Sequence, residues 1–206
     1  MKKCLLQCVH FRQVSVIGLR NQTNVWKRES SNTRLPYRLR MYILDLDRLN
    51  LRSPYYVWKV KDGVYAFDTD YEVSYEIGLS VNSEMLQMEA CVFDINNKNH
   101  KPSPNDHKLR DTILAIIEEF FRANGGVLLY ICATGDGMQK FRFRLFLRWF
   151  NTYEHRNLYE IRTVEDVMDD KTPNYGAIIV EKKHPDLELV LARFDELATF
   201  LKKPVV

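Results

Sequence analysis

Residues 72–81 alternate between apolar and polar side chains at every position. The apolar members are Val73, Tyr75, Ile77, Leu79 and Val81. Successive side chains of a strand point to opposite faces, so this pattern predicts a strand with one face on a core and the other in water. Strands of this kind are typical of antiparallel sheets, and such a sheet is therefore expected in the chain.

A tight hairpin is expected immediately before that strand. Residues 55–60 and 64–69 are apolar and aromatic, and Lys61-Asp62-Gly63 joins them. An Asp-Gly pair supplies the positive φ angles that a short turn needs. Residues 87–95 predict a fourth strand, so the four strands predict an antiparallel meander. Residues 41–51 fit either a first strand or a short lead-in.

Helices and strands alternate in the second half of the chain. Ser103, with Pro104 after it, predicts the start of a helix, and Asn124-Gly125-Gly126 predicts its end. Val127–Cys132 is a short apolar run and predicts a buried strand. The remaining expected elements are a helix at 138–153, a strand at 158–162, an acidic loop at 163–174, a strand at 175–182 and a helix from Pro185. The order β-β-β-β-α-β-α-β-β-α predicts an α+β fold with three helices on a mostly antiparallel sheet.

Residues 138–153 fit two periodicities. Residues 141–145 alternate as a strand would, but Phe146 and Phe150 break the alternation and extend a helical pattern, so a helix is expected. The stripe expected on its apolar side is Met138, Phe141, Leu145 and Trp149. The bases that recur every four residues are Lys140, Arg144 and Arg148.

The basic charge of the chain is confined to residues 1–40. That segment holds nine of the 30 lysines and arginines and one of the 27 acids, a net +8, which leaves residues 41–206 with 21 bases and 26 acids, a net −5. Residues 1–40 show no sustained periodicity and predict a basic, disordered extension, either an ordinary tail or an arm for nucleic acid. A further interpretation is that translation starts at Met41. Residues 41–206 are expected to form a single α+β domain.

Several protein classes are disfavoured by the sequence. The apolar runs are far shorter than the roughly 20 residues of a membrane-spanning helix, and residues 4–11 do not resemble a signal peptide. We therefore expect a cytoplasmic protein without membrane association. Four cysteines are too few for a disulfide scaffold. No nucleophile-elbow, phosphate-loop or zinc-protease motif occurs, so the sequence predicts no catalytic residue and no cofactor.

Two groups of residues resemble incomplete metal sites. Cys4, Cys8 and His10 lie close together but lack a second pair of ligands. His107 and Asp111 would share one face of a helix, and no third ligand can be assigned to them. The sequence therefore predicts no metal site.

The turn that follows Val127–Cys132 is the main candidate site. A helix N-terminus presents unpaired N–H groups and a partial positive charge, and glycines in the turn would let a phosphate approach the backbone. Asp136 argues against an anion, because its carboxylate would itself cap the helix. The candidate residues for an anion or a partner are Thr134, Gly135, Gly137, Lys140, Arg144 and Arg148.

The basic helix that follows this turn has three interpretations. Its bases, including Arg142, and its aromatic residues could bind single-stranded nucleic acid by charge and stacking. Alternatively, the aromatic residues belong to the core, and Arg144 and Arg148 are solvated or pair with Glu118 or Glu119. The third interpretation is a basic stripe that meets an acidic partner protein.

Residues 104–150 also carry a family resemblance. The segments that carry it are Leu109-Arg110-Asp111-Thr112-Ile113, Glu118-Glu119-Phe120-Phe121, Leu128-Leu129-Tyr130-Ile131-Cys132, Asp136-Gly137 and Arg144-Leu145-Phe146 with Arg148-Trp149-Phe150. In these segments the chain resembles a family of uncharacterised Bacteroidota proteins, a domain of unknown function, over about residues 55–204. The resemblance implies a bacterial, soluble, single-domain protein and brings no activity, cofactor or catalytic residue.

The leading hypothesis is a cytoplasmic protein of unknown function, without enzymatic activity, that binds a protein partner. The alternative is a nucleic-acid or nucleotide (phosphate) binder that uses residues 135–148. The two hypotheses share one surface, the basic face of the helix.

Overall fold

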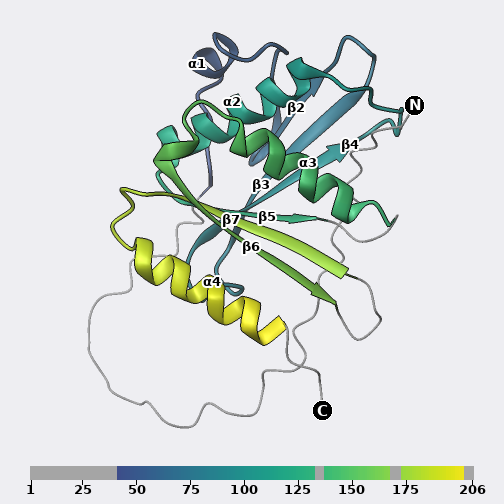
Figure 1. Cartoon of the computed structure of the whole chain (residues 1–206). Coiled ribbons are helices and arrows are strands. Elements are labelled where there is room, and N and C mark those ends of the chain that lie inside the picture. Colours follow the sequence, from purple (N-terminus) through teal and green to yellow (C-terminus); the bar gives the residue numbers. More distant parts are fainter. Residues whose placement is uncertain (1–40, 133–136, 168–172, 202–206) are drawn as a thin grey trace.

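The computed structural model describes residues 41–132, 137–167 and 173–201 (Figure 1). The predictions made for residues 1–40, including the basic extension and the group of Cys4, Cys8 and His10, lie outside the described residues. The elements in chain order are α1 (Leu46–Asn50), β1 (Trp58–Lys61), β2 (Val64–Asp68), β3 (Ser74–Asn82), β4 (Ala90–Asn97), α2 (His107–Asn124), β5 (Val127–Cys132), α3 (Gln139–Asn151), the 3-10 turn η1 (Arg156–Leu158), β6 (Tyr159–Val167), β7 (Pro173–Glu181) and α4 (Leu187–Leu201).

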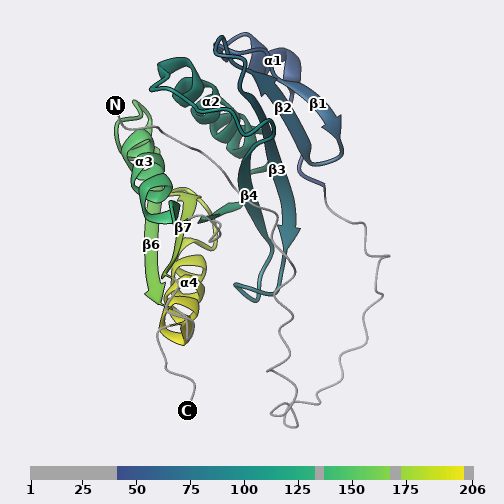
Figure 2. The same ribbon diagram turned by 90° about the vertical axis from the view of Figure 1, so that its right-hand side faces the viewer.

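The described strands form one seven-stranded sheet in the order β1-β2-β3-β4-β5-β7-β6. Each neighbouring pair is antiparallel except β4 and β5, which are parallel because α2 crosses over between them. β1 and β2 therefore lie at one end of the molecule and β6 and β7 at the other (Figure 2). The predicted α+β class, with a mostly antiparallel sheet, is confirmed.

Helices cover both faces of the sheet. Leu128 and Tyr130 of β5 pack into one core with residues of α2 and α3. Val127 and Leu129 point to the opposite face and pack with α4. In Figure 1, α2 and α3 accordingly lie above β5 and β7, and α4 lies below them. The helix α3 is thus held by β5 and β7 and presents its other side outward.

The start of the chain's described part is a lead-in with a short helix, α1, which the predicted element order lacked. Asp45 caps α1, since its side chain accepts a hydrogen bond from the N–H of Arg48 at 3.1 Å. The apolar residues of this segment are therefore not a strand. Tyr42 and Leu44 instead pack into the core below α2.

The predicted cap of α2 was wrong by three residues. Asp106, and not Ser103, precedes the first turn, and its Oδ1 atom accepts a hydrogen bond from the N–H of Lys108 at 2.9 Å. The Oδ2 atom of Asp106 also accepts a hydrogen bond from the hydroxyl of Tyr55 at 2.8 Å. The predicted end is confirmed, because Gly125 adopts a left-handed φ of 59° and closes the helix.

The described parts of the predicted acidic loop at 163–174 are strand, and residues 168–172 lie outside the described residues. β6 continues to Val167 and β7 begins at Pro173, with an unbroken register between them. The acidic composition misled the prediction, because an edge strand can direct charged side chains into water while alternate residues stay buried. Val164 is buried and Glu165 is exposed, which shows this alternation.

Candidate partner-binding site on α3

Residues 139–151 form a helix, as predicted, but its buried side differs from the predicted one. The residues that pack into the core are Phe143, Phe146 and Phe150. Phe146 stacks on Tyr130 of β5 with ring centroids 4.0 Å apart. Of the predicted stripe, Leu145 and Trp149 are half-buried and pack against the edge of this core, but Phe141 does not, since 40 % of it is exposed.

Arg142 does not belong to the exposed basic face. Only 1 % of Arg142 is exposed. It lies one turn before Phe146 and on the same side of α3. The hypothesis that Arg142 contributes to a basic surface is therefore wrong. Arginine is rarely buried, so its place under α3 could not be expected from composition.

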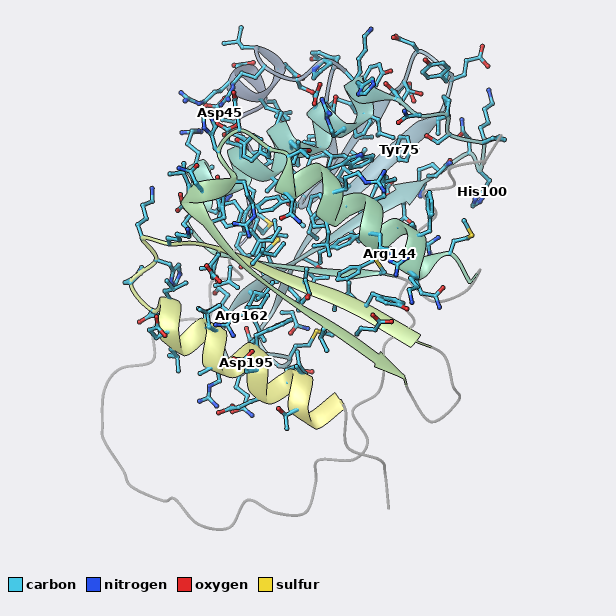
Figure 3. The ribbon with its side chains drawn as sticks, in the orientation of Figure 1. Asp45, Tyr75, His100, Arg144, Arg162 and Asp195 are labelled. Carbon is cyan, nitrogen blue, oxygen red and sulfur yellow. The ribbon has the colours of Figure 1, made fainter. Side chains whose placement is uncertain are left out.

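The other predicted bases do lie on the outside of the helix. Lys140, Arg144 and Arg148 are exposed and recur once per turn. Arg144 appears on α3 in Figure 3. Two of these bases border a shallow hollow of about 190 Å³, here called the α3 hollow, which is lined by Phe141, Arg144, Leu145 and Arg148. Their i, i+3, i+4 and i+7 spacing places the four on one side of the helix.

The charges around the α3 hollow are unevenly paired. Lys140 forms an ion pair with Glu165 of β6 at 3.5 Å between Nζ and Oε1. Within the described part of the chain, neither the Arg144 nor the Arg148 guanidinium forms a hydrogen bond or an ion pair within 4 Å, although the charge of Arg144 helps to lower the pKa of Glu165. The hollow therefore combines apolar walls with two exposed cations that make no direct ion pair among the described residues.

The expectation that Arg144 and Arg148 pair with Glu118 or Glu119 is wrong. Glu118 instead binds Arg52 and accepts a hydrogen bond from the hydroxyl of Tyr153 at 2.5 Å. Burial would raise the pKa of Glu118, but the hydrogen bonds from Tyr153 and Arg52 outweigh it and hold that pKa below its ordinary value. These contacts tie the loop after α1 to the end of α3, and nothing in the local sequence indicates them.

The predicted anion site is described only at its second half. Thr134 and Gly135, with the predicted cap Asp136, lie outside the described residues. Gly137 is exposed and has a left-handed φ of 71°, which a glycine adopts without strain. The described candidates Lys140, Arg144 and Arg148 lie further along the helix. The hollow bordered by the two arginines is therefore the part of the candidate site whose lining the described residues define.

The hollow itself was not predicted. Phe141 and Leu145 supply its apolar wall, although Leu145 also packs partly against the core as predicted. Their spacing with Arg144 and Arg148 is the sequence signal that could have indicated it. As for metals, the described residues contain no group of three or more His, Cys, Asp or Glu side chains able to hold an ion.

Glu165 should titrate below the ordinary range because of its neighbours. The hydroxyl of Tyr175 donates a hydrogen bond to Glu165 Oε1 at 2.9 Å, and this bond, followed by the charge of Lys140, lowers the carboxylate's pKa. The stabilisation is present above the ordinary carboxyl pKa and is lost as pH falls through the lowered one. We expect Tyr175→Phe to raise the pKa of Glu165, as measured by NMR of the side-chain carboxyl carbon. Tyr56→Phe, at an exposed position, is the control, and an unchanged Glu165 pKa in Tyr175→Phe would contradict the assignment.

Among the described residues, no helix has both the length and the apolar content to cross a membrane. Residues 105–196 match a family of unknown function (DUF6169). No curated protein and no solved structure matches the chain. The family match begins beside the cap of α2 and ends within α4, so α3 and its hollow lie inside the segment that resembles this family of unknown function.

Proposed function

We propose that the chain is a cytoplasmic binding protein without enzymatic activity, and that its α3 hollow receives an acidic segment of a partner protein with an apolar side chain. One observation carries the proposal. Arg144 and Arg148 border an apolar hollow, and within the described residues neither makes a direct ion pair, although Glu165 lies within electrostatic reach of Arg144. A carboxylate of the partner would complete the charges, and an apolar side chain would cover Phe141.

The lack of a direct ion pair at these arginines contrasts with two bases of α2. Lys108 pairs with Asp70 at 2.6 Å, and Arg122 pairs with Glu119 at 2.6 Å. Even Lys140, on the same helix as these arginines, reaches an acid. Because aromatic residues and arginine dominate the binding energy of many protein interfaces, the combination at the hollow favours a protein ligand.

Nucleic acid is the second candidate. The partly exposed Phe141 between arginines would suit base stacking. However, nucleic-acid binding draws its affinity from many phosphate contacts, and this face offers two free bases, since Lys140 is paired and Arg142 is buried. Residues 41–206 also carry a net −5, from 21 bases and 26 acids. The charge balance therefore favours a protein partner. The bacterial origin implied by the family resemblance stays a prediction.

The proposal can be tested with peptides selected from a random library on the full chain. We expect the selected peptides to be enriched in Asp and Glu next to apolar residues. In fluorescence anisotropy, Arg144→Glu/Arg148→Glu should weaken binding of the best peptide by at least about tenfold, because two attractive charges become repulsive. The matched control is Lys61→Glu/Lys182→Glu, which changes the net charge equally at exposed positions away from α3.

A labelled oligothymidylate of similar length separates the two candidates. Weak binding of the oligonucleotide that the double arginine variant does not alter would support the protein ligand. Tight, salt-sensitive binding of the oligonucleotide that is lost in the variant, without selection of acidic peptides, would overturn it. Equal weakening of the peptide by the control variant would show that general charge, and not the hollow, attracts the peptide.

A further inference from the structure

The two edges of the sheet differ in how they are protected. β1 is a four-residue strand with an irregular register, and it carries Lys59 and Lys61. Short length, irregularity and lysines are features that keep an edge strand from pairing with another chain. β6, at the other edge, has nine residues and pairs with β7 without a bulge. β6 is therefore the edge that is built to accept another strand.

The hydrogen bonds of β6 show which backbone groups face outward. The N–H of Lys182 donates to the carbonyl of Leu158 at 2.9 Å, so residues of even number in β6 bond to β7. In an antiparallel pair the backbone N–H and C=O groups of the alternate residues then point away from the partner strand. In β6 these residues include Ile161 and Thr163. The outward carbonyl of Tyr159 already accepts a hydrogen bond from Arg156 at 2.6 Å. From Ile161 onward, the edge is unpaired within the described residues.

We propose that a second copy of the chain pairs with β6 in antiparallel fashion, about a two-fold axis at Ile161. This register places Glu160 opposite Arg162 of the partner subunit, and the symmetry creates the same pair a second time. Tyr159 then lies opposite Thr163 of the partner subunit, and the two Ile161 residues meet. The Tyr159 carbonyl, which already accepts from Arg156, has a second lone pair for the N–H of Thr163 of the partner subunit. A register shifted to a two-fold axis at Thr163 would instead place Ile161 opposite a glutamate. Charge and polarity therefore select the first register.

The surroundings of β6 leave the required groups accessible. Arg162 forms an ion pair with Asp195 of α4 at 3.1 Å, yet 44 % of its side chain is exposed, so its guanidinium can contact a second carboxylate (Figure 3). Glu160 is half-buried and has no ion pair within the described part of the chain. The helix α3 packs mainly on β5 and β7, one strand in from the edge. This pairing is independent of the α3 hollow.

Sedimentation equilibrium of the full chain tests the pairing. We expect a mass that rises with concentration toward twice 24.4 kDa. Thr163→Pro should abolish the dimer and preserve the fold, because proline removes an N–H that points away from β7. Glu160→Lys should weaken the dimer by at least about tenfold, and adding Arg162→Glu should restore part of that loss. Asp62→Lys, an exposed substitution in the turn between β1 and β2 at the opposite edge of the sheet, should leave the dimer unchanged.

Cross-linking checks the register. Opposite residues in a hydrogen-bonded antiparallel pair have Cα atoms about 5.5 Å apart, within disulfide range. Ile161→Cys should therefore form a disulfide-linked dimer, whereas two Thr163→Cys residues would lie roughly 14 Å apart and should not exceed the unsubstituted chain. A chain that stays monomeric up to about 0.1 mM overturns the proposal, because edge pairing would then be too weak to matter. A dimer that Thr163→Pro does not affect overturns it as well.

Discussion

Replacing Phe146 with alanine should destabilise the domain by about 3–5 kcal/mol, the cost typical of removing a buried phenylalanine. Only 2 % of Phe146 is exposed, and its ring stacks on Tyr130. It also lies near Phe150 on the same helix, with ring centroids 6.4 Å apart. The substitution would leave a cavity between α3 and β5 that rigid neighbours fill only in part. Urea denaturation followed by circular dichroism measures the loss.

Phe141→Ala is the matched control for this prediction. The residue type and helix are the same, but Phe141 is partly exposed on the outer side, so its removal should cost less than about 1 kcal/mol. The control should nevertheless weaken a ligand of the α3 hollow. If the two alanine variants lost equal stability, the buried side of α3 would not be the one that contains Phe146.

Local sequence patterns predicted most of the sheet, because strands and tight turns depend mainly on residues that are close together in the chain. Val127–Cys132 was placed correctly, since a short apolar run between a glycine stop and a glycine turn has few other structures available. The Asp-Gly turn before β2 was also correct, and Gly63 has the positive φ that such turns require. The cap of α2 was missed for a physical reason. Both Ser103 and Asp106 can cap a helix, and the distant Tyr55 hydroxyl helps hold Asp106 in place.

The buried side of α3 could not be derived from its own sequence. The helix carries aromatic residues on two sides, and the periodicity of each is helical. The choice between them is made by Tyr130 of β5, against which Phe146 stacks. Packing this side of α3 on β5 also buries Arg142 and exposes Phe141. The packing therefore determines which bases belong to the candidate site.

Contacts between residues far apart in the chain were also beyond the sequence. Glu119 illustrates this best, because the sequence suggests it as a partner for the bases of α3. Its side chain instead faces the segment before α1, where its Oε1 atom accepts a hydrogen bond from the N–H of Asp45 at 3.1 Å. No pattern in either segment indicates a contact across 74 residues.

Glu119→Ala should cost about 2–3 kcal/mol, because it leaves the N–H of Asp45 without its acceptor and reduces the contacts of the Arg122 guanidinium to a longer ion pair with Asp45. Glu119 is 5 % exposed, and Arg122 binds it through two hydrogen bonds of 2.8 and 2.6 Å. Since the carboxylate links α2 to the lead-in of α1, we also expect faster amide exchange at Leu49. Chemical denaturation measures the first effect, and hydrogen exchange by NMR measures the second.

Glu196→Ala is the control, because Arg193 and Glu196 also form an i, i+3 ion pair on a helix. There the glutamate is 64 % exposed, so the pair is solvated and its removal should cost less than about 0.5 kcal/mol. Glu119→Gln should fall between the two, since its amide oxygen can still accept from Asp45 while its NH₂ group faces Arg122. Equal losses of unfolding free energy in Glu119→Ala and Glu196→Ala would show that the buried carboxylate does not stabilise the segment before α1. An unchanged amide exchange rate at Leu49 would show that it does not stabilise α1.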